Sequence, residues 1–290
     1  MEGDRKSSII KEARQIKLIA LDMDGTLLDS SKTLSAGNRS ALERAMEQGI
    51  HVVIATGRVL SALPADVVAV PGIEFAITSN GANVVRLKDR RTLYSNLIDR
   101  GSVEKIMDLL EDPDIMAEVF FDHDAFAEKR CLDHLEHFHM LTERSKAYTL
   151  ATRKPVDSIA RLVCDHADQL ESLNLIFRDM ERRSEVWDRL AVLDGMTITS
   201  SMPNNIEVGG ASASKADGLA HLAELLGVRR EQVMACGDSE NDMAMLHYAG
   251  LSVAMGNAVP GVCAASDVVT KTNDEDGVAW AIERYALARS

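Results

Sequence analysis

The sequence predicts an α/β protein with a doubly wound, mostly parallel, Rossmann-like sheet that carries an inserted α+β module. Toward both ends of the chain, short apolar runs typical of strands buried on both faces alternate with helical segments. In the middle of the chain, paired strands are mixed with helices, which indicates a module of different architecture. A length of 290 residues with 46% hydrophobic residues is sufficient for two domains.

The first part of the sheet is predicted from three buried strands, each followed by a polar loop. These strands are expected at 18–21, 50–55 and 75–78. Helices are expected between them, over 35–48 with Gly49 as its stop, and over 59–69 before Pro71.

The alternation of strands and helices resumes after a stretch of small residues from Gly209 to Ser212, which is predicted to be a hinge. An amphipathic helix is predicted over 214–226, with Gly227 at its end. Further strands are expected at 233–236, 251–255 and 268–270, with helices at 239–249, 259–265 and 276–287.

The middle of the chain predicts hairpins and shorter helices. Hairpins are expected over 83–95 and 118–128, strands at 172–177, 197–200 and 205–208, and helices from Ser102 to 110, from Cys131, over 156–170 and over 181–193. The predicted boundaries are an N-terminal arm of residues 1–15, a core domain of 16–82 and 210–290, and an inserted domain of 83–209.

The charge and cysteine content of the chain limit the kinds of binding partner and cellular compartment that are expected. Lys and Arg total 32 against 45 Asp and Glu, and this net charge of −13 argues against non-specific nucleic-acid binding. The four cysteines are far apart and form no C-x-x-C pair, which predicts reduced thiols in a cytoplasmic protein. No apolar run is long enough to span a membrane. The oligomeric state is left open.

The first strand ends in two carboxylates, in the run Leu18-Ile19-Ala20-Leu21-Asp22-Met23-Asp24-Gly25-Thr26. The carboxyl end of a strand is where open α/β sheets bind ligands. A carboxylate there is costly to desolvate unless a cation or hydrogen-bond donors meet it. For an isolated D-x-D-G, an ordinary turn closing a strand is the simpler interpretation.

Three further segments share that location, just after a buried strand or at the start of the next helix. They are Thr56-Gly57-Arg58, Lys215 and Gly237-Asp238-Ser239-Glu240-Asn241-Asp242. Taken singly, each has a structural explanation, such as a turn, a solvated lysine or a capping box from Ser239 to Asp242. As an ordered set, they supply the groups that phosphoryl transfer needs.

The residue types indicate roles. Asp22 can attack phosphorus and Asp24 can protonate the leaving oxygen and then activate water. Mg²⁺ prefers hard oxygen ligands, which Asp22 and Asp238 can provide. Lys215 offers a positive charge to the phosphoryl group. The Thr56 hydroxyl and the Gly57 N–H, near a helix start, are suited to an anion.

With these motifs in order, the chain resembles the haloacid dehalogenase superfamily of phosphatases, in its Cof-like branch with a type IIB cap. The matching segments are LDMDGT, ATGR, the Lys215 helix and GDSENDMAML, followed by VAMGNA and TKTNDEDGVAWAI. The resemblance spans residue 16 to about 287 and is weak in the inserted module. One departure is Ala216 after the lysine, where the family often has glycine.

The resemblance implies a Mg²⁺-dependent phosphatase with Asp22 as nucleophile and Asp24 as acid/base. The implied Mg²⁺ ligands are the Asp22 side chain, the Asp24 carbonyl oxygen and Asp238. Asp242 is implied to contact these ligands without binding the metal directly. Thr56, Lys215 and Asn241 are implied to hold phosphate. The module at 83–209 is implied to close over the site and select a small phosphorylated metabolite, either a sugar phosphate or a related compound.

Other functions are less consistent with the sequence. A P-loop fails because the residues around Lys215 do not fit its pattern. A zinc site from His134, His137 and His139 is disfavoured, since His139 points elsewhere on a helix. A phosphomutase using the same aspartates, or a non-catalytic sugar-phosphate sensor, remains as an alternative. The substrate itself is not predicted; basic and histidine side chains of the module that could meet one are Arg130, His134, His137, Arg178, Arg182 and Arg183, although solvated surface is the simpler expectation for each.

Overall fold

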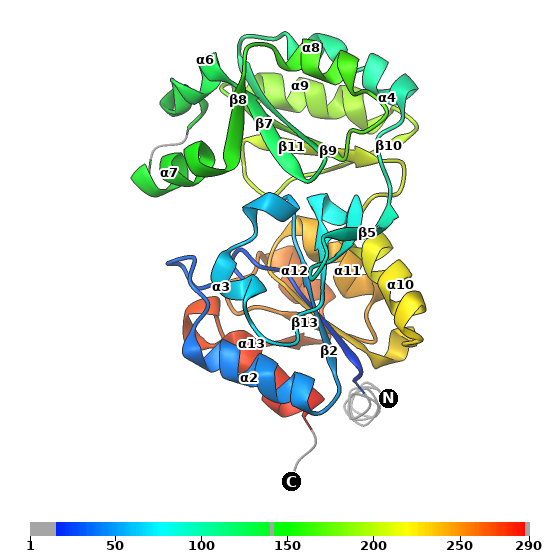
Figure 1. The fold of residues 1–290 in the computed structure, drawn as a ribbon. Coiled ribbons are helices and arrows are strands. Elements are labelled where there is room, and N and C mark those ends of the chain that lie inside the picture. Colours follow the sequence, from blue (N-terminus) through cyan, green and yellow to red (C-terminus); the bar gives the residue numbers. More distant parts are fainter. Residues whose placement is uncertain (1–15, 140–141, 288–290) are drawn as a thin grey trace. The chain divides into compact units, whose positions relative to one another are not determined.

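The structure is a computed structural model that describes residues 16–139 and 142–287, and these form two compact units (Figure 1). The core unit comprises residues 16–57, 64–94 and 214–287. The other, called the cap unit here, comprises residues 58–63 and 95–213.

The core unit is built on an eight-stranded sheet with the order β14-β13-β12-β1-β2-β3-β4-β5. Its strands are β1 (Leu18–Leu21), β2 (His51–Ala55), β3 (Phe75–Thr78), β4 (Asn83–Arg86), β5 (Arg91–Ser95), β12 (Val233–Gly237), β13 (Leu251–Ala254) and β14 (Val268–Val269). From β14 to β3 the pairing is parallel, and β4 pairs antiparallel with β3. Every residue of β1 is buried, as expected for a central strand covered on both faces.

Helices cover both faces of this sheet, which makes it doubly wound (Figure 1). They are α2 (Ala36–Glu47), α3 (Ala65–Val68), α10 (Lys215–Leu226), α11 (Met243–Tyr248), α12 (Pro260–Ala265) and α13 (Gly277–Ala281). Short 3₁₀ turns are η3 (Ser79–Gly81), η5 (Arg230–Gln232), η6 (Glu240–Asp242) and η7 (Asn273–Glu275), and η8 (Ile282–Ala286) is a π turn. Leu219 and Leu222 of α10 pack with Leu246 of α11 on one face of the sheet.

The cap unit contains a six-stranded sheet with the order β10-β11-β9-β6-β7-β8, antiparallel except for the β7–β8 pair. Its strands are β6 (Ile115–Phe121), β7 (Asp124–Glu128), β8 (Arg153–Val156), β9 (Ser172–Phe177), β10 (Met196–Thr199) and β11 (Asn205–Gly210). Its helices are η2 (Leu60–Ala62), α4 (Arg100–Glu104), α5 (Met107–Leu110), α6 (Lys129–Leu132), η4 (Leu135–Phe138), α7 (Glu143–Thr152), α8 (Ile159–Asp165) and α9 (Met180–Ala191). Buried Leu109, Ile159 and Val186 pack in one apolar cluster with Val119 and Leu175 of the sheet.

The predicted α/β class and most elements agree with the structure, but three helix predictions were wrong. The helix expected over 59–69 is split into η2 and α3 at Pro64, which lacks an N–H and disfavours a helical residue before it. The helix from Ser102 begins earlier, because Asp99 caps it and Ser102 lies inside α4. The helix expected over 156–170 is shorter, and α7 and β8 precede it.

The unit boundaries also differ from the predicted ones. The hairpin of β4 and β5 extends the core sheet, so residues 83–94 belong to the core unit and the change of unit comes between 94 and 95. The second change comes between 213 and 214 instead of near 209, because β11 continues through Gly210. The arm predicted for residues 1–15 lies outside the described residues.

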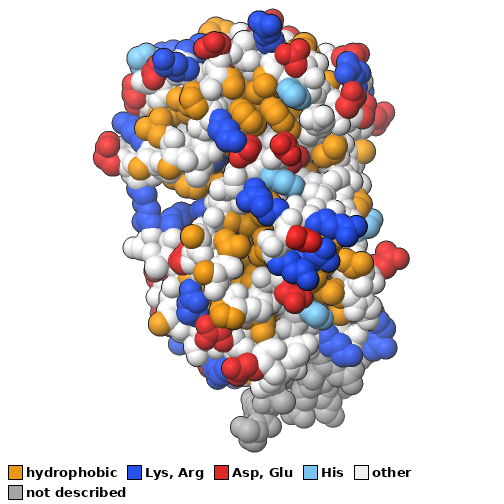
Figure 2. Space-filling view, in the orientation of Figure 1, with side chains coloured by type: hydrophobic (Ala, Val, Ile, Leu, Met, Phe, Trp, Pro, Cys, Tyr) orange, Lys and Arg blue, Asp and Glu red, His pale blue; other side chains and the backbone are white. Residues whose placement is uncertain are grey.

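Charged side chains of both signs are interspersed over the face of the molecule in Figure 2. Within residues 16–139 and 142–287, no helix has the length and apolar character needed to cross a bilayer. The four cysteines are unpaired, as predicted from their spacing, and Cys236 is a buried core thiol.

Candidate active site

The site lies where the central strands of the core sheet end. Leu21 is in register with Ile54 on one side and with Cys236 on the other, so Asp22, Thr56 and Asp238 all follow neighbouring strand ends. The Asp22 N–H donates to the Cys236 carbonyl at 3.1 Å, which extends the ladder to the aspartate itself. Asp22 is buried, with 6% of its surface exposed.

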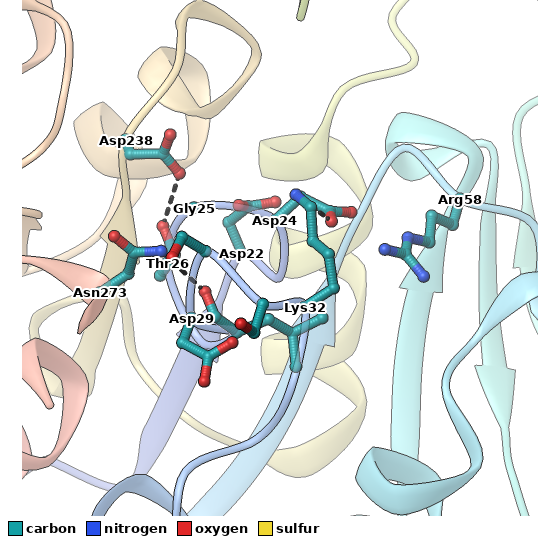
Figure 3. Close-up of polar contacts among 12 residues, drawn as sticks. Asp22, Asp24, Gly25, Thr26, Asp29, Lys32, Arg58, Asp238 and Asn273 are labelled. Carbon is teal, nitrogen blue, oxygen red and sulfur yellow. Dashed lines mark hydrogen bonds and ion pairs between the residues drawn. The ribbon is translucent and has the colours of Figure 1, made fainter. Parts of the chain in front are cut away.

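A tight turn after β1 brings Asp238 against the Asp22 loop. Gly25 has φ of +91°, and a Cβ there would lie 2.6 Å from the Asp238 Oδ2 atom. Glycine is therefore required both for the backbone conformation and for the close approach. The Thr26 hydroxyl donates to Asp238 Oδ1 at 2.8 Å (Figure 3), and the Ser239 hydroxyl donates to Oδ2 at 3.0 Å.

Lys215 is the first residue of α10, where Ser214 caps the helix by accepting from the Asp217 N–H. The lysine is fully buried, and its ammonium lies 2.6 Å from Asp22 Oδ1 and 2.7 Å from Asp242 Oδ1. The structure thus brings together three residues that are far apart in the chain. Ala216 in place of the usual glycine does not displace the start of this helix.

Asp242 uses both of its carboxylate oxygens inside the protein. Oδ1 contacts the Lys215 ammonium, and Oδ2 accepts the N–H groups of Asp238 and Ser239 at 2.9 and 3.0 Å. The second pair of contacts is the capping box expected from the sequence. Asp242 therefore holds the Asp238 loop and the lysine, with no oxygen left over.

The cluster of Asp22, Asp238, Asp242 and Lys215 sets three carboxylates against one ammonium. Burial, with repulsion from Asp242 and Asp238, raises the pKa of the Asp22 carboxyl. Burial and Asp242 likewise raise the pKa of Asp238, against the opposing hydrogen bonds from Thr26 and Ser239. Burial lowers the pKa of Lys215, but Asp22 and Asp242 outweigh it and the pKa is raised, so the lysine stays charged.

This excess of buried negative charge fits a divalent cation. One carboxylate oxygen from each of Asp22, Asp238 and Asp242 lies within 4.8 Å of the others. Asp242 is fully buried, and its oxygens hold the Lys215 ammonium and two backbone N–H groups. Asp238 is partly exposed and accepts from the hydroxyls of Thr26 and Ser239, so Asp22 and Asp238 are the better placed carboxylate ligands. Hard oxygen donors of this kind suit Mg²⁺.

The residues expected to hold phosphate gather beside this cluster in the core unit. Thr56 is 2% exposed, and its carbonyl accepts the Asn80 N–H at 3.0 Å. Asn80 also accepts from the Asn241 amide at 3.2 Å, and a Cβ on Gly57 would lie 3.2 Å from its Oδ1. Asn80, at φ of +52°, is thus a link between Gly57 and Asn241 that the sequence prediction missed.

Two asparagines that the sequence analysis did not single out hold the loop after β1. Asn257 donates to the Gly25 carbonyl at 2.8 Å and accepts from the Asn273 N–H at 2.9 Å. Asn273 donates to the Leu28 carbonyl at 3.0 Å. Both lie in the segments VAMGNA and TKTND, which carried the resemblance but had no assigned role. Another unforeseen contact joins Lys32 to Asp24 at 2.8 Å (Figure 3).

The candidate substrate-contacting side chains of the cap unit mostly have partners within that unit. The arginines pair as Arg130 with Glu128, Arg178 with Asp114, Arg182 with Asp112 and Glu185, and Arg183 with the Asn205 carbonyl. The rings of His134 and His137 stack on an exposed surface, with Glu136 close by. His139 does not join them, since its Nε2 contacts the Arg178 carbonyl at 2.9 Å.

Comparison with known proteins identifies the family to which the chain belongs. The profile of the haloacid dehalogenase-like hydrolases matches residues 19–282. The chain belongs to this family. It is 34% identical over 286 residues to the 5-amino-6-(5-phospho-D-ribitylamino)uracil phosphatase YcsE of Bacillus subtilis (strain 168), covering 97% of this chain and 100% of that protein.

Two further comparisons agree. Phosphatase YwpJ of Bacillus subtilis (strain 168) is 33% identical over 285 residues, covering 91% of this chain and 98% of that protein. A solved haloacid dehalogenase-like hydrolase from B. subtilis has a TM-score of 0.80 at 31% identity, covering 92% of this chain and 99% of that one. This haloacid dehalogenase-like hydrolase is therefore a phosphatase, and its parallel sheet and cap unit are those expected from the resemblance.

Proposed function

We propose that the protein is a Mg²⁺-dependent phosphatase that hydrolyses small phosphomonoesters through an aspartyl-phosphate on Asp22. The observation that supports the proposal is the buried Lys215 ammonium, which lies 2.6 Å from Asp22. It belongs to a cluster in which three carboxylates accompany this single positive charge. One ammonium does not offset three carboxylates, and buried charge that is left uncompensated is destabilising. An excess of negative charge at a strand end is instead suited to a metal and a phosphate.

In the first step, an Asp22 carboxylate oxygen attacks phosphorus and the bond from phosphorus to the leaving oxygen breaks. The proton that the leaving oxygen needs comes from the Asp24 carboxyl, two residues along the same loop. Burial of Asp22 and its contact with Lys215 fix the direction in which the nucleophile faces.

In the second step, water attacks the phosphorus of the aspartyl-phosphate, and Asp24, now a carboxylate, takes a proton from the water. The bond between phosphorus and Asp22 breaks, which restores both aspartates and releases inorganic phosphate.

The remaining residues bind and neutralise the phosphoryl group. Asp22, Asp238 and the Asp24 carbonyl oxygen are the proposed Mg²⁺ ligands, and a bound Mg²⁺ would supply charge stabilisation for the phosphoryl oxygens. Lys215 provides a fixed positive charge. Thr56, the Gly57 N–H and Asn241 are proposed to donate hydrogen bonds to the phosphate.

The substrate is proposed to be a sugar or sugar-alcohol phosphate. A relative at 34% identity is named for a compound that carries a phosphorylated ribityl chain, 5-amino-6-(5-phospho-D-ribitylamino)uracil. We therefore propose that compound as the first candidate, with other polyol phosphates as the wider class. The cap unit is proposed to choose among them.

The test is phosphate release from a panel containing this ribityl phosphate, several sugar phosphates and p-nitrophenyl phosphate, with and without Mg²⁺. We expect Mg²⁺-dependent release of free phosphate, with the highest kcat/KM on a polyol or sugar phosphate. A phosphomutase would return an isomeric phosphate and require a bisphosphate activator. A sensor would bind without turnover in folded protein, and either result would contradict the proposal.

A further inference from the structure

A short closed turn of the core unit follows the Asp22 loop, and Lys32 is near its end. The Asp29 N–H donates to the Thr33 carbonyl at 3.1 Å. The Lys32 N–H donates to the Asp29 carbonyl at 2.8 Å, and the Thr33 N–H donates to Asp29 Oδ1 at 2.9 Å. The turn therefore has a defined conformation within its own backbone.

Lys32 has an unusual backbone conformation in this turn, with φ of +54°. Residues with a side chain avoid this left-handed region, and glycine or asparagine adopts it at less cost. The turn alone gives no reason for a lysine at this position. The reason that the structure offers is the side chain, whose ammonium lies 2.8 Å from Asp24 Oδ1 (Figure 3).

The turn is held in place by contacts that do not involve this ion pair. Asn273 donates to the Leu28 carbonyl at 3.0 Å, and the Ser30 N–H donates to Asp274 Oδ1 at 2.7 Å. The Lys32 and Asp24 side chains are 46% and 34% exposed, and ion pairs as exposed as this one contribute little to stability. Loss of the Lys32 ammonium should therefore leave the fold intact.

We propose that Lys32 is a positioning residue for Asp24, which fixes the direction of the carboxyl group that transfers the proton. This inference rests on the proposed function, in which Asp24 serves the leaving oxygen. A partly exposed aspartate has several side-chain rotamers available, and an ammonium at 2.8 Å, carried by a turn of defined backbone conformation, restricts them.

The proposal has a kinetic signature, because leaving groups differ in how much they need a proton. Phenolate is a strong base and leaves poorly without protonation, whereas p-nitrophenolate is a weak base and leaves readily. Phenyl phosphate and p-nitrophenyl phosphate have similar shapes, so they separate proton transfer from binding. Their kcat/KM values report only the steps up to departure of the alcohol.

The experiment compares Lys32→Met with wild type on these two substrates. A well-placed general acid contributes on the order of 10²–10⁴-fold, so partial misplacement should lower kcat/KM for phenyl phosphate by about tenfold or more. For p-nitrophenyl phosphate the decrease should be at most about threefold, since the missing proton matters less. Lys32→Arg, which retains the positive charge, should restore most of the lost rate.

Arg44→Met is the matched control, because it also removes an exposed cation that pairs with an acid of the same unit, Glu283. It should leave both kcat/KM values unchanged. Equal decreases on both substrates in Lys32→Met, or no decrease, would overturn the positioning role. If wild type turns over neither substrate, the proposed function fails and the inference fails with it. If wild type turns over the substrates but the ratio of the two kcat/KM values is the same in Lys32→Met as in wild type, the inference alone is rejected.

Discussion

The core unit and the cap unit each bury a charged cluster against a sheet, but the two clusters are balanced differently. In the core unit, the Lys215 ammonium contacts the carboxylates of Asp22 and Asp242, and a third carboxylate, that of Asp238, lies close to these two. In the cap unit, the Arg153 guanidinium makes two contacts of 2.8 Å with the Glu118 carboxylate, one charge against one.

The cap cluster is also completed by neutral partners. Asn174 donates to Glu118 at 2.9 Å and accepts from Asn205 at 3.0 Å. The guanidinium lies over the rings of Phe120 and Tyr148. Burial lowers the pKa of Arg153, but the nearby Glu118 outweighs it, so the net shift is upward and the guanidinium stays charged.

The difference teaches how a buried ionic cluster can be interpreted. A balanced and fully hydrogen-bonded pair can be explained by folding alone, and apolar residues can often replace it. An unbalanced cluster is destabilising in itself and is retained where chemistry requires it. On this criterion we propose that the core cluster is the catalytic centre, and we interpret the cap cluster as structural.

The largest effect is expected from Asp22→Asn in the core cluster. Turnover should fall by roughly 10⁴-fold or more, because removal of the proposed nucleophile leaves only binding and electrostatic contributions. Its counterpart in the cap cluster, Glu118→Gln, should retain Mg²⁺-dependent turnover. Steady-state phosphate release measures both, and circular dichroism checks that both variants fold. Near wild-type activity in Asp22→Asn would remove the distinction between the clusters.

A second prediction concerns stability when a cation is removed. Lys215→Met and Arg153→Met should each lower the free energy of unfolding by about 3–5 kcal/mol, since each leaves buried carboxylate charge unpaired. Replacing both cap partners, as Glu118→Leu with Arg153→Met, should recover most of the loss because no charge remains. Urea unfolding measures all three variants. If the double variant is no more stable than Arg153→Met alone, the cap pair is not the simple balanced pair described here.

A third prediction concerns Mg²⁺, which we propose as a counter-charge of the core cluster. Saturating Mg²⁺ should stabilise wild type by about 2–3 kcal/mol at 100 times its Kd, which raises Tm. Asp238→Asn removes a proposed ligand and should abolish most of this shift, whereas Glu118→Gln should keep it. Thermal unfolding with Mg²⁺ and with EDTA measures the difference. An undiminished shift in Asp238→Asn would contradict its role as a ligand.

The smallest effect is expected from pH in the metal-free protein. Because the pKa values of Asp22 and Asp238 are raised by folding, the folded state binds protons more readily than the unfolded state. Between the ordinary and the raised pKa values, stability should therefore increase as pH falls and decrease as pH rises. The variant Asp22→Asn with Asp238→Asn should gain less on acidification, as measured by Tm in EDTA from pH 7 to about pH 5. An equal increase in Tm on acidification in wild type and in the double variant would contradict the assignment of this effect to Asp22 and Asp238.

Much of the core cluster could be predicted from sequence because parallel strands end at one edge of a sheet. The run before Asp22, the run before Asp238 and the helix that starts at Lys215 each have clear local signals. Once the topology is given, their side chains must converge. The ion pairs of Lys215 follow from that convergence and from the capping of α10 by Ser214.

Other features could not be predicted because they depend on loop conformation or on distant pairing. The Lys32 contact requires a left-handed lysine, which no local pattern indicates. The sequence of the β4–β5 hairpin is compatible with either sheet. Pairing of β4 with β3 places the hairpin in the core sheet. The helix α7 lacks a regular apolar stripe, with Thr149 as its buried residue, so periodicity does not reveal it. The split at Pro64, by contrast, was available from the sequence and was missed.

The most direct test of the central claim is to identify the phosphorylated residue. The Asp24→Asn variant should slow hydrolysis of the intermediate, so an acid-quenched reaction with p-nitrophenyl phosphate and Mg²⁺ should retain covalent phosphate. Peptide mass spectrometry is expected to place one phosphoryl group on Asp22, and none in the variant that also carries Asp22→Asn. A phosphoryl group on any other residue, or none in Asp24→Asn although it still releases p-nitrophenolate, would contradict the account.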